Sequence, residues 1–166
     1  MMTKEQYEAW TSWFRRNPGS IRVLRGINDG LTYLCYLLYP ALLAYSALYR
    51  QDLLLKMVLV PGIAFVAVSL FRRVFDAPRP YEALDIDPII KKATSGRSFP
   101  SRHIFSVFMI AMCYLRVCVP LGCALCVCGA VMAVIRVLGG VHYPKDVIAG
   151  AVVAIVCGAI GLWLVP

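Results

Sequence analysis

The stretch GLTYLCYLLYPALLAYSALY, residues 30–49, carries no charged side chain over 20 consecutive positions. At about 1.5 Å per residue, a helix of that length crosses the roughly 30 Å hydrocarbon core of a bilayer. Four further apolar runs follow, each with at most one charged residue: 53–71, 104–119, 121–135 and 147–166. The sequence therefore predicts an all-α fold, an integral membrane bundle of five transmembrane helices.

The composition of the whole chain supports the same class. Of its 166 residues, 60% are apolar and 16% are charged, and the mean hydropathy is +0.72. Soluble domains are about 45–50% apolar and about 25% charged, and a domain of this size buries only about two-thirds of its surface. These values argue against a soluble globular domain and exclude a disordered chain. We expect a single domain over residues 1–166, embedded in a cell membrane.

The N-terminal segment is amphipathic instead of uniformly apolar. Thr3 and Gln6 form the pattern of a capping box, and Asn17-Pro18-Gly19 predicts the end of a helix. Four aromatic residues cluster toward one face: Tyr7, Trp10, Trp13 and Phe14. Tyr and Trp favour the headgroup level, so residues 3–17 are predicted to form an interfacial helix in contact with membrane lipids. A simple positive orientation signal is the alternative interpretation.

The charge balance limits the partners. The chain has 17 Lys and Arg against 9 Asp and Glu, a net charge of +8. On a membrane protein this excess suits loop orientation, anionic headgroups or an anionic substrate. Nucleic acid is not expected, because no basic stretch lies on a soluble face interleaved with aromatic residues. The 7 cysteines lie in or beside apolar runs without His or carboxylate partners, so we expect them to pack in the membrane and not to bind a metal.

Alternating spans bring many ionisable residues to one side of the membrane. If the N-terminal helix marks that side, the second span ends there at Arg72 and the fourth at Arg136, and the third and fifth spans start there. Both histidines of the chain, His103 and His142, lie on the same side. Ionisable groups at membrane depth are costly and mark functional sites. We therefore place a candidate site on this side, with the polar loop 76–101 as part of it.

The orientation of that side stays open. It carries every Lys and Arg except Arg50, Lys56 and Arg116. By the positive-inside rule this excess puts the site in the cytoplasm. Several of the arginines are themselves candidate substrate ligands, which biases the count, so the sequence does not decide between the two membrane faces.

The spacing around His142 suggests a nucleophile. Asp146 follows four residues later, and Pro144 favours a helix start between them, so one helical turn brings the carboxylate to the imidazole. A carboxylate on one ring nitrogen fixes the tautomer and leaves the other nitrogen to attack. His103, just inside the third span, suits protonation of a leaving group. The alternative for Asp146 is a carboxylate that simply complements the helix dipole.

The remaining polar residues suit an anionic substrate. Ser101 is a candidate N-cap, beside the free N–H groups of a helix start. Arg72, Arg79 and Arg136 can contact phosphate oxygens through their planar guanidinium groups. Such charges stabilise the transition state of phosphoryl transfer. Any one of these arginines alone could equally anchor a helix end at the headgroups, and it is their joint pattern that favours a site.

Three segments together resemble a known family pattern. They are RRVFDAPRP (72–80), PSRH (100–103) and IRVLGGVHYPKD (135–146). Their order and intervals are similar to K-x6-R-P, P-S-G-H and S-R-x5-H-x3-D, the pattern of the type 2 phosphatidic acid phosphatase superfamily. Three positions depart from it, since Arg72 replaces Lys, Arg102 replaces Gly and Ile135 replaces Ser. Arg102 either crowds the phosphate or adds a cation for a diphosphate or a second acidic group.

The resemblance implies a lipid phosphatase, similar to small bacterial members of the family in the inner or plasma membrane. It implies a phosphohistidine on His142, oriented by Asp146, with His103 as the acid and then the base. It further implies phosphate binding by Arg72, Arg79, Ser101, Arg136 and the variant position Arg102, with no metal and no cofactor. The substrate classes are polyprenyl diphosphates, which we favour, phosphatidylglycerophosphate and phosphatidate.

Two alternatives remain beside hydrolysis. A lipid phosphotransferase would use the same phosphohistidine and pass it to an alcohol. A non-catalytic membrane protein of the same fold would need no nucleophile; the intact set of His142, Asp146 and His103 argues against it, and Arg102 is its best support. The sequence gives no indication of an oligomeric state.

Overall fold

The computed structural model describes residues 2–91 and 94–165. Met1, the loop residues Lys92-Ala93 and Pro166, the end of the fifth predicted span, lie outside the described residues. The helices in chain order are α1 (Lys4–Arg16), α2 (Pro18–Tyr49), α3 (Gln51–Phe75), α4 (Pro80–Ala83), α5 (Arg102–Leu115), α6 (Val119–Leu138) and α7 (Pro144–Ala159), and a π-helical segment, η1 (Ile160–Leu164), continues α7. Within the described ranges there is no strand, so the predicted all-α fold is confirmed.

Four helical stretches are long and apolar enough to cross a membrane: α2, α3 with its continuation to Ala83, α6, and α7 with η1. The remaining predicted span, residues 104–119 and third along the chain, corresponds to α5, a shorter apolar helix of 14 residues or about 21 Å. α5 packs against α2, α3, α6 and α7. The bundle therefore has the predicted five apolar helices, and the shortest of them is enclosed by the other four.

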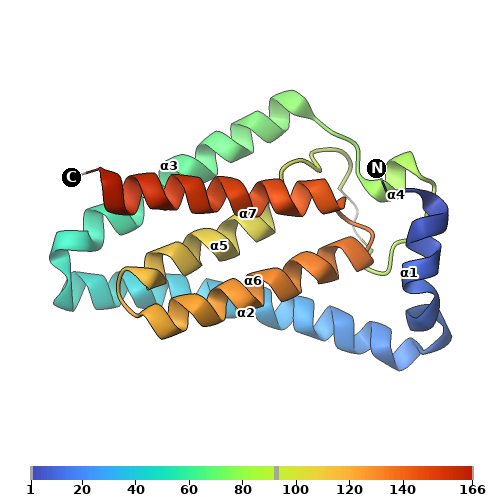
Figure 1. Cartoon of the computed structure of the whole chain (residues 1–166), viewed down its shortest axis with the longest axis horizontal. Coiled ribbons are helices and arrows are strands. Elements are labelled where there is room, and N and C mark those ends of the chain that lie inside the picture. Colours follow the sequence, from blue (N-terminus) through green and yellow to red (C-terminus); the bar gives the residue numbers. More distant parts are fainter. Residues whose placement is uncertain (1, 92–93, 166) are drawn as a thin grey trace.

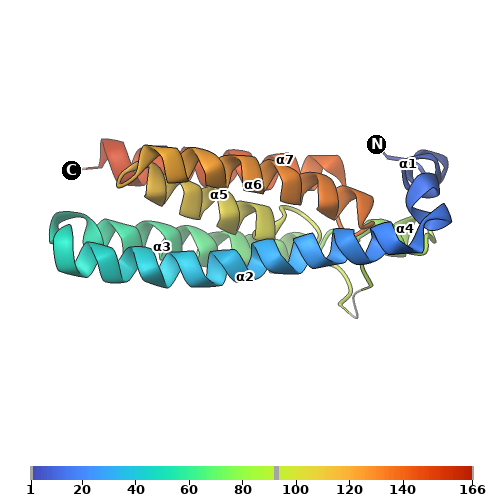
Figure 2. The same ribbon diagram turned by 90° about the horizontal axis from the view of Figure 1, so that it is seen from below.

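The helices lie in two layers with α5 between them. Figure 2 shows α2 and α3 in one layer and α6 and α7 in the other. α5 contributes the centre of the apolar core, with Ile104, Ala111 and Cys113 fully buried. The helices alternate in direction, so the end of α3, the start of α5, the end of α6 and the start of α7 all lie at one end of the bundle (Figure 1). This confirms the predicted gathering of these helix ends.

Small residues on α7 let this helix approach α5 closely. Gly150, Ala154 and Gly158, spaced four residues apart, are all buried. A Cβ atom at Gly150 would lie 2.6 Å from the carbonyl oxygen of Ser101. In the same contact, the backbone N–H of Ser101 donates to the carbonyl oxygen of Asp146 at 2.9 Å. The close packing therefore fixes the start of α5 beside the start of α7.

The N-terminal helix α1 lies across the end of the bundle that holds these helix ends (Figures 1 and 2). Its capping box between Thr3 and Gln6 forms as predicted. Trp10 and Trp13 are exposed, at 45% and 60% of their surface. The helix is too short and too polar to span a membrane and suits the interface, as its sequence predicts.

Tyr7 differs from the prediction, because it faces the protein and not the headgroups. The residue is fully buried, and a Cβ atom at Gly140 would lie 2.8 Å from its hydroxyl oxygen. That hydroxyl accepts the backbone N–H of Ile89 at 3.3 Å. Desolvation by this burial raises the pKa of the Tyr7 phenol. α1 is thus packed onto the loop that follows α6.

Helix α2 begins earlier than its apolar run, at Pro18 instead of near residue 30. Proline at the first helical position has the backbone angle that a helix start needs, so the turn expected at Asn17-Pro18-Gly19 separates two consecutive helices. The polar first turns of α2 contact the long loop, since Nε and Nη2 of Arg25 donate to the carbonyl oxygen of Ile89 at 2.9 and 2.6 Å.

Candidate active site

The predicted pair of His142 and Asp146 forms at the start of α7. His142 is 2% exposed and Asp146 is fully buried. Nδ1 of His142 lies 3.5 Å from Oδ2 of Asp146. The same carboxylate oxygen accepts the backbone N–H of Tyr143 at 3.0 Å, which holds it at the first turn of the helix. With Nδ1 facing the carboxylate, Nε2 lies on the opposite side of the ring, as the predicted attack by the other ring nitrogen requires.

Ser98 completes this pair, and sequence reasoning did not identify it. Its hydroxyl donates to Oδ2 of Asp146 at 2.5 Å and lies 3.4 Å from Nδ1 of His142. Because the hydroxyl proton is directed to the carboxylate, the Ser98 oxygen can accept a hydrogen bond from Nδ1–H, which favours the tautomer with an unprotonated Nε2. The sequence signal that could have found Ser98 is its position two residues before Pro100, at the start of the second motif.

The surroundings of His142 favour its neutral form. Burial is the largest cause and lowers the pKa of this imidazole to about 4, and the positive charges of Arg79 and Arg136 act in the same direction. The hydrogen bond and charge of Asp146 oppose the decrease. The predicted role of His142 as a nucleophile requires an unprotonated nitrogen, and a pKa of about 4 keeps the imidazole neutral at pH 7.

Two buried arginines connect the loops around this pair. Nη1 of Arg72, which is 5% exposed, donates to the carbonyl oxygen of Ser98 at 3.2 Å and to that of Pro100. Arg79, which is 6% exposed, donates from Nε to Gly96 at 2.9 Å and from Nη1 to Val141 at 3.3 Å, in both cases to the carbonyl oxygen. A guanidinium can hold the loops and still present further N–H groups, which accounts for an arginine at position 72.

Arg136 is the least satisfied charge in the site. It is 1% exposed, and neither its Nε nor its Nη1 has a hydrogen-bond partner among the described residues. The buried hydroxyl of Ser101 also lacks a partner there; the residue begins α5 by position, without the predicted side-chain cap. A buried cation without an acceptor costs free energy, and a bound anion removes that cost. The arrangement indicates an anion-binding site.

The structure brings most of the predicted site residues together. Six of them form one buried group: Arg72, Arg79, Ser101, Arg136, His142 and Asp146. The other two lie on the first turn of α5, at the edge of the group. Arg102 is exposed, with its Cζ 5.8 Å from the centre of the Phe65 ring. His103 is half-buried and lines a cavity of about 200 Å³ together with Arg102 and Phe65.

The structure also gives the positions of Ile135 and the cysteines. Ile135, at the place of the family's Ser, packs in an apolar cluster with Leu24, Ile89 and Val141. All seven cysteines are unpaired thiols, and Cys35 and Cys113 are buried in the apolar core. Among residues 2–91 and 94–165, no group of three or more His, Cys, Asp or Glu side chains lies together as metal ligands would.

Comparison with known proteins gives one sequence relative of stated function. Undecaprenyl-diphosphatase BcrC of Bacillus subtilis (strain 168) is 33% identical over 100 residues, which is 60% of this chain and 51% of that protein. The match thus spans about half the length of this relative.

Two solved structures have a similar fold. Aquifex aeolicus LpxE has a TM-score of 0.75 and 26% identity, covering 98% of this chain and 95% of that chain. A transmembrane PAP2 type phosphatidylglycerolphosphate phosphatase from Bacillus subtilis has a TM-score of 0.70 and 22% identity, covering 95% and 83%. Together with the apolar helices, they confirm an integral membrane protein.

The family comparison covers the site directly. The model of the PAP2 superfamily matches residues 53–166, which is more than half of the chain. This range includes the buried histidine and carboxylate, the three buried arginines and the start of α5. The resemblance found in the motifs is therefore confirmed, and this chain belongs to the PAP2 superfamily.

Proposed function

We propose that this protein hydrolyses lipid phosphates through a covalent phosphohistidine at His142, without a metal ion. The observation that carries the proposal is a buried imidazole–carboxylate pair beside Arg136, a buried guanidinium with unpartnered N–H groups. Polyprenyl diphosphate is the substrate class we favour, because the relative with 33% identity is an undecaprenyl-diphosphatase. Phosphatidylglycerophosphate and phosphatidate are the other candidate substrates.

The first step forms the covalent intermediate. Nε2 of His142 attacks the phosphorus, and the bond from phosphorus to the leaving oxygen breaks. Asp146 and Ser98 hold the Nδ1 side of the ring and stabilise the positive charge that develops on it. His103, on the first turn of α5, gives a proton to the leaving oxygen when this is a lipid alkoxide.

The second step releases phosphate. An unprotonated His103, produced by the first step when an alkoxide leaves or present from the start when the leaving group departs as an anion, takes a proton from water, and the water oxygen attacks phosphorus while the bond to Nε2 breaks. His142 returns to its neutral form, which its buried surroundings favour. The products of the two steps are the dephosphorylated lipid and inorganic phosphate, and the enzyme is free again.

The buried arginines stabilise the charge on the phosphoryl oxygens in both steps. Arg72, Arg79 and Arg136 surround the pair, and the Ser101 hydroxyl adds a neutral donor. Arg72 and Arg79 are held by backbone carbonyl groups before substrate arrives, so little reorganisation is needed in the transition state.

The test is phosphate release by the detergent-purified protein in EDTA, against lipid monophosphates and diphosphates, beside His142→Gln. We expect release by the wild type and a loss of about 10⁴-fold or more in the variant, because removal of a nucleophile leaves little catalysis. With ³²P in the terminal phosphate, a quench in base should retain label on the wild-type protein and none on the variant.

Arg50→Gln, at the opposite end of the bundle, is the matched control and should release phosphate like the wild type. Activity of His142→Gln near the wild-type level would refute the phosphohistidine. Transfer of label to an added alcohol in preference to water would instead identify a phosphotransferase.

A further inference from the structure

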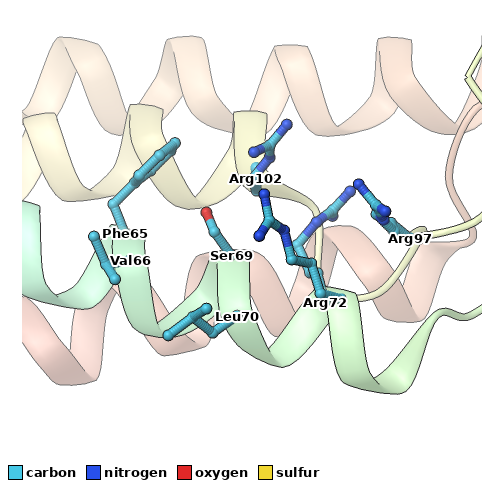
Figure 3. A pocket seen from close by; sticks show the side chains of 8 residues that line it. Phe65, Val66, Ser69, Leu70, Arg72, Arg97 and Arg102 are labelled. Carbon is cyan, nitrogen blue, oxygen red and sulfur yellow. The ribbon is translucent and has the colours of Figure 1, made fainter.

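A second group of arginines lies outside the buried site. They line a cavity of about 290 Å³ between α3, the start of α5 and the loop before it, and Arg72 belongs to both places. The other members are Arg73, Arg97 and Arg102, all exposed. Figure 3 shows the labelled arginines at one end of this cavity and the apolar side chains of Phe65, Val66 and Leu70 at the other.

Most of the positive charge of this cavity is not neutralised by a carboxylate among the described residues. Among the described residues, neither Arg73 nor Arg102 has a carboxylate within 4.0 Å, and Arg97 has one at that limit, Asp76. Arg97 and Arg102 lie close enough to Arg72 for their charges to repel it. Like charges held close together repel one another, and an anionic ligand bound between them offsets that repulsion.

The backbone holds Arg97 in place at a conformational cost. Its φ is 53°, in the left-handed region that residues with a side chain rarely adopt. Asp76, itself at φ 35°, accepts the backbone N–H of Arg97 at 3.2 Å. Gly96 fits between them because a Cβ atom there would lie 2.5 Å from the Asp76 carboxylate oxygen. Strain of this kind at two contacting residues is typical of a functional position.

We infer that Arg97 and Arg102, assisted by Arg73, bind the phosphate that departs with the lipid when the substrate is a lipid diphosphate. The inference rests on the proposed function, since it places the terminal phosphate at His142 and the second phosphate in the cavity of Figure 3. Arg72, which lines this cavity and also contacts the loop of Ser98 and Pro100, lies between the two phosphates. The apolar end, with Phe65, receives the first carbons of the lipid.

The chemistry of the leaving group gives these arginines a role in specificity. In a diphosphate, the bond between the terminal phosphorus and the bridging oxygen breaks, and the electron pair stays on that oxygen as part of a lipid monophosphate. The last proton of a phosphate monoester dissociates near pH 6, so this group departs as an anion and needs cations more than a proton. A lipid alkoxide is far more basic and needs the proton from His103.

The test compares farnesyl diphosphate with farnesyl monophosphate, which share one lipid tail. The variants are Arg102→Gln and Arg97→Gly, the second chosen because glycine keeps the left-handed backbone without strain. We expect each to lower the ratio of kcat/KM for the diphosphate to that for the monophosphate by about tenfold, as the loss of a charge-assisted contact does. The ratio does not depend on the fraction of folded enzyme.

Arg116→Gln removes the same charge at the far end of α5, where Cζ of Arg116 lies 5.3 Å from the Trp163 ring, and should keep the wild-type ratio. An equal fall for both substrates in Arg102→Gln and Arg97→Gly would overturn the inference, as would a wild-type enzyme that hydrolyses the monophosphate and not the diphosphate; in both cases the proposed function stands. A wild type that releases phosphate from no lipid on the panel would refute the proposed function itself.

Discussion

The two ends of the bundle carry charge in different ways. At the end with α1, three arginines, a histidine and an aspartate are buried, and two of the arginines, Arg72 and Arg79, donate to loop backbone. At the opposite end, Arg50 pairs with Asp52 at 3.1 Å while both side chains stay largely exposed. Lys56 reaches the carbonyl oxygen of Val165 at 2.6 Å, also on the surface. Both ends are polar, but among the described residues only the end with α1 has buried charged side chains.

The backbone conformation also differs between the two ends, and the strained residues lie at the site end. Within the described ranges, the three residues other than glycine with positive φ, Asp76, Asp85 and Arg97, all lie in or beside the long loop of the site end. The opposite end joins α2 to α3 through the single residue Arg50. Costly burial and strained backbone coincide at one end, which is where a selected function is expected. The following experiments test that difference.

Ser98→Ala should produce the largest effect of this comparison. Loss of the hydroxyl removes one hydrogen bond to the Asp146 carboxylate and one contact with Nδ1 of His142. A hydrogen bond to a charged group contributes about 1.5–3 kcal/mol, so kcat should fall by about 10- to 100-fold. Steady-state phosphate release measures it.

Ser46→Ala is the matched control at the other end. Ser46 is also fully buried, and its hydroxyl has no hydrogen-bond partner among the described residues. Its removal should leave kcat and the melting temperature at the wild-type values. If the two serine variants behave alike, the polar network of Ser98 has no role in catalysis.

The protonation of His142 can be measured directly. In His103→Gln, His142 is the sole histidine of the chain, and its ring signals can be followed by NMR in detergent micelles. We expect a midpoint near pH 4, because burial outweighs the opposing effect of Asp146. At pH 5 the ring is then about 90% neutral. A midpoint at or above the ordinary value near 6.5 would contradict the dominance of burial.

The lowered pKa of His142 also makes the stability of the folded protein depend on pH. Between pH 6.5 and 4 the His142 imidazole is mostly protonated in the unfolded chain and mostly neutral in the folded protein. Unfolding therefore takes up a proton in that range, and the folded state loses stability as the pH falls through it.

Arg50→Gln should have the smallest effect. The pair with Asp52 is exposed, and such pairs add little to stability. Both kcat/KM and the melting temperature should stay at the wild-type values, as measured by phosphate release and by thermal unfolding in detergent. A large loss of activity would show that the opposite end of the bundle is coupled to the site.

Much of the fold could be predicted because lipid imposes simple rules on sequence. Uncharged runs give the spans, and their alternation gives the end at which His103, Arg136 and His142 meet. The pair of His142 and Asp146 also follows from local geometry, since one helical turn joins residues four apart.

Other features depend on contacts between distant segments, which spacing does not reveal. Ser98 meets Asp146 across 48 residues of chain, and Tyr7 meets the loop at Ile89 across 82. The direction of the Arg102 side chain, toward Phe65, depends on the packing of α3 against α5. Such details require the folded arrangement of the long loop.

The packing of Tyr7 has a consequence for how the enzyme meets its substrate. The exposed Trp10 and Trp13 predict that α1 lies at headgroup level, and Tyr7 packs this helix against the loop that carries His142. With α1 at that level, we expect the candidate active site to lie at the depth of the lipid phosphates, so that a substrate enters by lateral diffusion within the bilayer. Its rate should then follow the mole fraction of the lipid in the membrane plane, a two-dimensional concentration, and not the bulk concentration of vesicles.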